Sequence, residues 1–210
     1  MNSIKNLEWR YATKKFDATK TLLSSQINTL KEAFNLTATS YGLQPVKMIV
    51  IQNKEIQNQL VAHSWNQPQV AQASHVLVLC IPKEYTTKDV ENYFSLVKNI
   101  RNTPNEILNP FKEMLTSSIA TKTQEELKTW NTNQAYIALG NLMTVAANEQ
   151  IDSCPMEGFI PEKYDEILNL DKHNLTSVLV LPVGFRAEDD FMKDLKKVRR
   201  KTSEVVIEIN

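Results

Sequence analysis

Short apolar runs alternate with longer amphipathic stretches along the whole chain. Runs of this length are typical of buried strands rather than of helices. They predict strands over residues 46–51, 75–81, 151–154 and 177–183. The run that ends at Ile81 is apolar almost throughout, so we expect that strand to be buried on both faces.

Between these runs, apolar residues recur at the three- and four-residue spacing of a helical face. Helices are predicted over residues 2–12, from a cap at Ser24 or Ser25 through Phe34, over 54–65, within 87–128 with interruptions around Pro104 and Pro110, over 123–149, and from Pro161. A few buried strands among longer helices indicate an α+β fold. No internal repeat or change in composition divides residues 1–210, so one domain is expected.

The C-terminal end carries a further apolar run. Residues 204–209 read as a strand and follow a basic stretch that ends at Lys201. A strand isolated behind a charged tether often pairs with something distant. Its apolar edge would be exposed in a monomer.

Composition excludes several classes of function. The chain has 24 basic and 24 acidic residues, so no global field draws it to nucleic acid or an anionic membrane. Residues 193–201 are locally basic, but they lack the interleaved aromatic residues of a nucleic-acid surface. No apolar run approaches membrane-spanning length. Neither the three histidines nor Cys154 shows the spacing of a metal site. Cys80 reads as a buried thiol, and a reducing cytoplasm is the expected compartment.

Only four glycines occur in the chain. They form neither a Gly-x-Gly-x-x-Gly fingerprint nor a Walker phosphate loop. A phosphorylated cofactor would therefore have to be held by side chains. Arg10, Lys14, Lys197 and Arg199 are the candidates, although charges on an amphipathic helix are most often merely solvated.

Four further fragments complete the pattern that begins at Arg10. They are Ser40-Tyr41-Gly42-Leu43-Gln44-Pro45, Asn66-Gln67-Pro68-Gln69, Pro155-Met156-Glu157-Gly158-Phe159 and Lys197-Val198-Arg199. In this order and at these separations, they resemble the flavin-dependent nitroreductase family, with the oxygen-insensitive nitroreductase and dihydropteridine reductase branch as the nearest likeness. The resemblance covers nearly the whole chain. It implies a central sheet flanked by helices, with the C-terminal strand exchanged in an intertwined homodimer.

The resemblance also assigns roles to residues around an FMN. Arg10, Arg199 and Lys197 match the phosphate-binding group, and Lys14 matches a lysine at the pyrimidine side of the ring. The amide of Glu157 or Gly158 would face the ring nitrogen that accepts hydride. The remaining expected contacts are Tyr11, Ala12, Thr39, Ser40, Gln44, Asn66, Gln69, Pro155 and Met156.

The chain departs from the family's pattern at several of these positions. Tyr11 and Ala12 stand where many relatives have histidine and serine, which leaves backbone contacts there. Gly42 and Val46 replace an asparagine and a tryptophan. Gln69 replaces a lysine, so the charge on this side of the ring should be weaker and the flavin's reduction potential lower.

The function that the resemblance implies is a ping-pong oxidoreductase. NADH or NADPH would reduce the FMN, and a nitroaromatic, quinone or pterin-like acceptor would then take two electrons. No side chain need act as a nucleophile, because the flavin carries the chemistry. The alternatives are a flavin reductase that passes reduced flavin to a partner, and a flavin-binding protein without catalysis.

Overall fold

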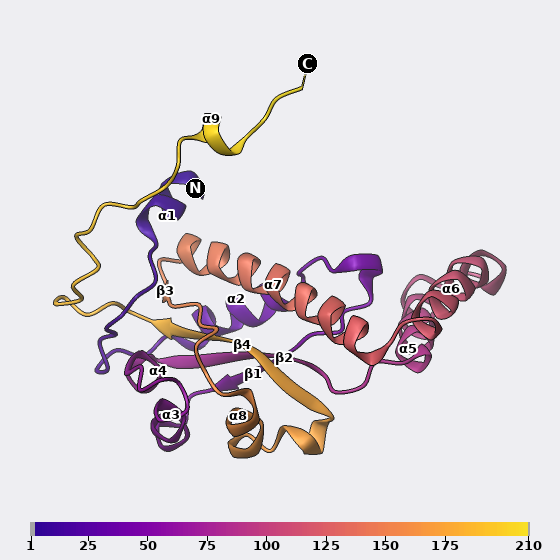
Figure 1. The fold of residues 1–210 in the computed structure, drawn as a ribbon, viewed down its shortest axis with the longest axis horizontal. Helices are drawn as coiled ribbons and strands as arrows, with labels where there is room; N and C mark the ends of the chain where they lie inside the picture. The colour runs from indigo at the N-terminus through magenta and orange to yellow at the C-terminus, as the bar shows by residue number, and fades with distance from the viewer. Residues whose placement is uncertain (1–2, 210) are drawn as a thin grey trace.

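The computed structural model describes residues 3–209 and is built around one antiparallel sheet (Figure 1). The strand order is β1-β2-β4-β3. The strands are β1 (Lys47–Ile51), β2 (His75–Pro82), β3 (Asp152–Ser153) and β4 (Leu175–Gly184). All four lie where the apolar runs predict them.

Strand β2 is buried along nearly its whole length, as its composition predicts. It pairs with β4 in a register that places Val78 opposite Val180, with an irregularity after Leu79. Because successive side chains point to opposite faces, Leu77 and Leu79 enter one core cluster while Val78 enters another. Each face of the sheet therefore needs its own cover of helices.

Helices provide that cover. The α-helices are α1 (Ser3–Trp9), α2 (Ser24–Asn35), α3 (Lys54–Val61), α4 (Gln69–Gln72), α5 (Thr87–Arg101), α6 (Asn105–Ala120), α7 (Gln124–Asn148), α8 (Pro161–Ile167) and α9 (Thr202–Val205), and short 3₁₀ turns span Ser40–Gly42 and Leu170–His173. Helices α2 and α7 cover one face of the sheet, and α3 and α8 cover the other (Figure 1).

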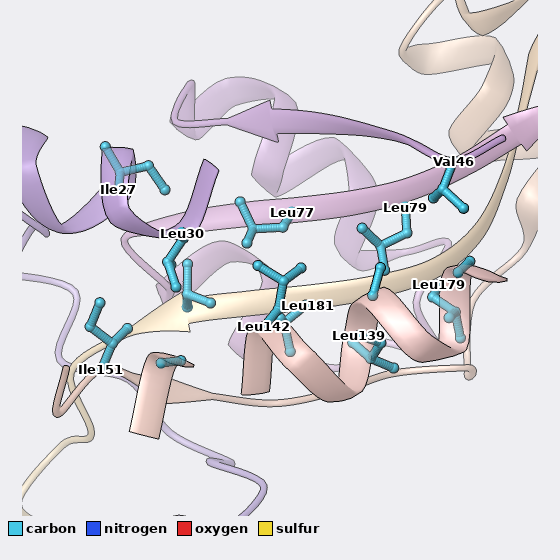
Figure 2. Close-up of a cluster of buried hydrophobic side chains, with 14 of the residues drawn as sticks. Ile27, Leu30, Val46, Leu77, Leu79, Leu139, Leu142, Ile151, Leu179 and Leu181 are labelled. Atoms are coloured by element: carbon cyan, nitrogen blue, oxygen red, sulfur yellow. The ribbon is translucent and has the colours of Figure 1, made fainter. Parts of the chain in front are cut away.

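The predicted central helix is confirmed as α7. Thr123 caps its first turn, and Glu126 returns the interaction to the Thr123 backbone. Leu139 and Leu142 point from α7 toward the sheet, where they meet Leu181 among others (Figure 2). This buried contact fixes the position of α7 against the sheet.

Helices α5 and α6 form a hairpin at the end of the molecule away from α1 (Figure 1). They share a small core of their own, in which Phe94 and Leu115 pack with Leu127 of α7. The interruption predicted at Pro104 is correct, whereas Pro110 lies inside α6. Pro110 is on the exposed side, where solvent can satisfy the carbonyl that loses its helical partner.

Three other boundaries differ from the sequence prediction. The first helix ends at Trp9 rather than at residue 12, and its predicted start at residue 2 lies outside the described residues. The cap of α2 is Leu23, whose backbone N–H donates to the Gln26 side chain, so neither Ser24 nor Ser25 caps it. Helix α3 stops at Val61 instead of 65, and a turn follows it.

The predicted C-terminal strand is wrong for the single chain. Residues 202–205 form the short helix α9, and residues 206–209 have no regular structure. Ile207 and Ile209 are exposed. A strand needs a neighbour to satisfy its backbone groups, and the tail runs out past α1, away from the sheet (Figure 1). No described helix has both the length and the apolar character needed to cross a membrane.

Candidate functional site

The segment after α1 lies against the end of the sheet. Ala12 forms a parallel bridge with Ser153 of β3, and the Thr13 N–H donates to the Ser153 carbonyl at 3.3 Å. Strand β3 ends at Ser153, and the next residue, Cys154, leads into the Pro155 loop. Two motifs that lie about 140 residues apart in the sequence, 10–17 and 155–158, are thereby brought side by side.

A basic cavity opens where the C-terminal segment returns to α1. Its volume is about 520 Å³. Its walls include six of the predicted site residues: Arg10, Tyr11, Ala12, Pro155, Lys197 and Arg199. The Lys197 ammonium donates to the carbonyl of Arg10, which holds the C-terminal segment over the cavity.

The electrostatics of this cavity favour an anion. Burial lowers the pKa of Arg10, and the positive charge of Arg199 lowers it further. Burial likewise lowers the pKa of Lys197, with added repulsion from Arg10 and Arg199. The Nε of Arg10 is buried and has no acceptor within residues 3–209. A phosphate would give this group an acceptor and relieve the repulsion among the three cations.

Lys14 does not line this cavity. Its ammonium lies 3.9 Å from the Sγ of Cys154. Burial raises the pKa of the Cys154 thiol, although Lys14 opposes the shift. The backbone of Lys14 is fixed by Asp190, whose carboxylate is buried and accepts from the Lys14 N–H at 2.9 Å. The ammonium therefore projects from a rigid stretch of chain.

The loop at 155–158 is held as an extension of the sheet. Met156 and Val180 exchange two backbone hydrogen bonds, of 2.8 and 3.1 Å, and the Met156 side chain is buried. The Tyr136 hydroxyl of α7 donates to the Glu157 carboxylate at 2.6 Å. Throughout the described chain, no group accepts from the backbone N–H of Glu157 or Gly158. These two donors remain available to a ligand.

Asn66 and Gln69 lie in different settings. Asn66 is exposed and sits in a turn with Trp65, where both residues have positive φ. Gln69 is only 2 % exposed, and its Nε2 donates to the Oε1 of Gln67 at 2.8 Å. The Gln69 amide nitrogen is thus directed to Gln67 and to the sulfur of Cys154.

Thr39, Ser40 and Gln44 are not part of this assembly in the single chain. The Ser40 N–H donates to Gln134 of α7, whereas Asn6 of α1 bonds Asn148 at the end of the same helix. These two anchors are fourteen residues apart, which is about 21 Å along a helix. The Ser40 loop therefore lies far along α7 from the Arg10 cavity.

Comparison with known proteins shows which family the chain belongs to. The model of the nitroreductase family matches residues 7–185. A Staphylococcus epidermidis protein with the provisional name NAD(P)H nitroreductase is 36% identical over 189 residues, which cover 86% of this chain and 86% of that one. The chain belongs to the nitroreductase family. The family resemblance drawn from the sequence is confirmed.

Solved structures of family members agree with this fold. A Bacillus subtilis structure superposes with a TM-score of 0.86 at 18% identity, covering 98% of both chains. A structure from Exiguobacterium sibiricum, described as a complex with FMN, has a TM-score of 0.84 at 17% identity and covers 100% of this chain and 98% of that one. At these identities the likeness concerns the fold. The matched family region ends before Lys197 and Arg199, so their assignment rests on the cavity.

The structure also reveals residues that the family's sequence motifs do not mark. Asp190 holds the Lys14 backbone, and Asp152 binds the Arg186 Nε at 2.7 Å. The Arg186 guanidinium in turn lies 4.1 Å from the centre of the Trp9 ring. An aspartate in a charged stretch gives no signal in a single sequence, because most such residues are solvated. Only its 1 % exposure distinguishes Asp190.

Proposed function

We propose that the protein is an FMN-dependent NAD(P)H oxidoreductase. The observation that carries the proposal is the buried Nε of Arg10, which has no acceptor within residues 3–209 and lies in a cavity shared with Lys197 and Arg199. Three cations at one site suit a single terminal phosphate. The chain has no glycine-rich dinucleotide motif, so FMN fits this site better than FAD does.

The other motifs supply contacts for the ring. When bound, a flavin supplies the two-electron redox chemistry. Lys14, whose ammonium lies beside Cys154, would place a positive charge near its pyrimidine side, and the free N–H of Glu157 or Gly158 would donate toward the ring nitrogen that accepts hydride. A preorganised donor of this kind needs no rearrangement during the reaction. Asn66 would border the polar edge, and Tyr11 and Ala12 would contribute their backbone, whereas the amide of Gln69 is directed to Gln67 and Cys154.

The site is completed by a second copy of the chain. Support comes from the Ser40 loop, which is anchored about 21 Å along α7 from the Asn6 contact. Thr39, Ser40 and Gln44 would then serve the flavin of the partner subunit. The exposed apolar tail supports an intertwined homodimer, since Ile207 and Ile209 have no cover in one chain.

The acceptors that we propose are nitroaromatics, quinones and pterin-like compounds, with NADH or NADPH as the donor. The test is steady-state kinetics with FMN-loaded protein, in which NAD(P)H oxidation is followed with each acceptor in turn. Turnover that depends on the acceptor, with parallel lines in double-reciprocal plots, supports the ping-pong oxidoreductase. Turnover only with added free flavin would identify a flavin reductase. Absence of turnover with bound FMN would leave a flavin-binding protein.

A further inference from the structure

Two glutamine side chains connect the buried Cys154 to the loop at Gly158. The Nε2 of Gln69 donates to the Oε1 of Gln67 at 2.8 Å and lies 3.9 Å from the Cys154 sulfur. The Nε2 of Gln67 then donates to the Gly158 carbonyl at 3.1 Å. Lys14 touches the same sulfur at 3.9 Å. One line of polar contacts thus runs from the Lys14 segment to the Gly158 carbonyl.

Gly158 is closely enclosed by this arrangement. A Cβ atom at Gly158 would lie 2.8 Å from the Trp65 ring and 3.2 Å from the Nε2 of Gln67. Trp65 and Asn66 are both left-handed, and the Gln67 N–H closes their turn on Ser64 at 3.0 Å. Left-handed backbone is uncommon for a bulky residue such as Trp65. The turn therefore presses an indole and an amide against one short peptide.

The same peptide is held from its other sides. Tyr136 fixes the Glu157 carboxylate, and Met156 is bonded to Val180 of β4. The N–H groups of Glu157 and Gly158 nevertheless have no acceptor in the part of the chain that the structure describes. The Gly158 carbonyl belongs to the next peptide unit, whose Phe159 N–H donates to the Glu157 carbonyl at 2.9 Å. A segment that is fixed at this carbonyl while the two preceding N–H groups stay free is suited to present a donor to a ligand.

We propose that Gln67 and Gln69 are positioning residues that aim the Glu157–Gly158 peptide at the flavin ring. Gln67 holds the Gly158 carbonyl directly, and Gln69 acts through Gln67 by fixing its Oε1. The inference rests on the proposed function, because the aim of the peptide matters only where a flavin lies against it. Position 69 contributes to the reaction by holding the loop, rather than by facing the ring with a charge.

The first experiment compares FMN-loaded wild type with Gln67→Leu, Gln69→Leu and the double variant. Anaerobic stopped-flow reduction by NADH or NADPH, the midpoint potential of the bound flavin and the Kd for FMN are measured. Gln67→Leu is expected to slow reduction roughly tenfold or more while the Kd changes by less than about threefold, because a small misplacement of a donor mainly affects the reaction. The double variant should be no slower than Gln67→Leu, since Gln69 acts through Gln67.

Gln57→Leu is the matched control. Gln57 is a fully buried amide on α3 whose Nε2 donates to the Ala73 carbonyl at 3.4 Å, away from the loop. This variant should keep the reduction rate and the potential, since the Ala73 carbonyl retains the Lys54 ammonium as a donor. A second readout needs no cofactor. In the apoprotein, hydrogen exchange at the hydrogen-bonded amides within residues 155–160, those of Met156, Phe159 and Ile160, should be faster in Gln67→Leu and Gln69→Leu and unchanged in Gln57→Leu.

The proposal is overturned if Gln67→Leu is reduced at the wild-type rate, with an unchanged potential and unchanged exchange at 155–160. Should Gln67→Leu fail to fold, Gln67→Met retains the side-chain length without the amide and is read by the same criteria. Wild-type protein that binds no FMN would refute the proposed function instead. In that case, unchanged exchange in the apoprotein variants would overturn the loop-holding role as well, and faster exchange would support it.

Discussion

The buried carboxylate of Asp190 accepts a hydrogen bond from the backbone N–H of Lys14 at 2.9 Å, across 176 residues of sequence. The same oxygen accepts from the Lys15 N–H at 3.1 Å, and the other oxygen accepts from Met192. One side chain therefore ties the segment that bears Arg10 and Lys14 to the start of the C-terminal segment that bears Lys197. Both halves of the basic site depend on it.

Replacement of this carboxylate should weaken the fold and the site together. Asp190→Asn is expected to lower the free energy of unfolding by about 2 kcal/mol, because hydrogen bonds to a buried charge are lost. Asp189→Asn is the matched control. Asp189 pairs with Lys15 at the exposed surface, and its loss should cost less than about 1 kcal/mol. Urea unfolding of both variants measures the difference, and equal effects would contradict the role given to Asp190.

Asp190 also predicts a pH dependence of stability. Burial by itself would raise the pKa of its carboxyl, but the hydrogen bonds from the backbone of Met192, Lys15 and Lys14 outweigh burial and lower the pKa. The stabilisation that the ionised Asp190 carboxylate gives to the folded state is therefore complete above the unfolded-state pKa of about 3.9. It is lost as the pH falls through the lower folded-state pKa. Unfolding measured between about pH 6 and pH 2 should show a shallower acid loss in Asp190→Asn than in wild type. Parallel curves would contradict this.

Sequence reasoning found the core of the fold because its strands are apolar. The runs around Val78 and Val180 carry the signal, and α7 shows helical spacing over its whole length. It failed at the C-terminus for the single chain, since the tail at Ile207 has the composition of a strand but no neighbour to pair with. The predicted helix break at Pro110 is also wrong, because Pro110 lies on the exposed side of α6, where solvent can hydrogen-bond the carbonyl that loses its helical partner.

The candidate site was partly accessible from the sequence. Arg10, Lys197 and Arg199 were named together, and they line one cavity. The surroundings of Gln69 could not be read from residue types, since an amide in a polar loop is usually exposed, whereas Gln69 is buried against Gln67. The need for glycine at position 158 is likewise visible only in the structure, because a Cβ there would lie 2.8 Å from the Trp65 ring.

Removal of a phosphate-binding cation should weaken FMN binding selectively. Arg199→Ala is expected to cost about 2–3 kcal/mol, or roughly 30–150-fold in Kd, because a charge-assisted contact is lost. Lys128→Ala removes an exposed cation of α7 that does not line the cavity, so it serves as the control. Fluorescence titration of both apoproteins with FMN measures the effect. Equal losses would mean that the phosphate lies elsewhere.

Lys14 should affect the flavin's reduction potential and its rate of reduction more than it affects the affinity for FMN. Reduction places negative charge on the pyrimidine side of the flavin, and position 69, where the family resemblance implies a second lysine, is a glutamine in this chain. Lys14→Met should lower the midpoint potential by roughly 20–40 mV, equivalent to about 1–2 kcal/mol, and slow reduction by the nicotinamide. Spectroelectrochemistry of the two proteins provides the answer. An unchanged potential with a collapsed FMN affinity would make Lys14 a binding residue.

Truncation of the C-terminal tail tests whether a second copy of the chain completes the site. Deletion of residues 203–210 removes the exposed apolar tail, including Ile207 and Ile209. We expect the truncated protein to be a monomer without bound flavin, because the described part of the chain leaves the apolar tail exposed. Light scattering and flavin content are measured on the same preparation. A truncated monomer that retains FMN would refute the proposed intertwined dimer.

The central claim is that the cavity at Arg10 holds FMN. The most direct measurement is the absorption spectrum of the purified protein, followed by chromatography of whatever is released on denaturation. We expect a yellow protein that releases FMN and no FAD, in a ratio of one per chain. A colourless protein that takes up no FMN when it is offered in excess would show that the Arg10 cavity is not an FMN site.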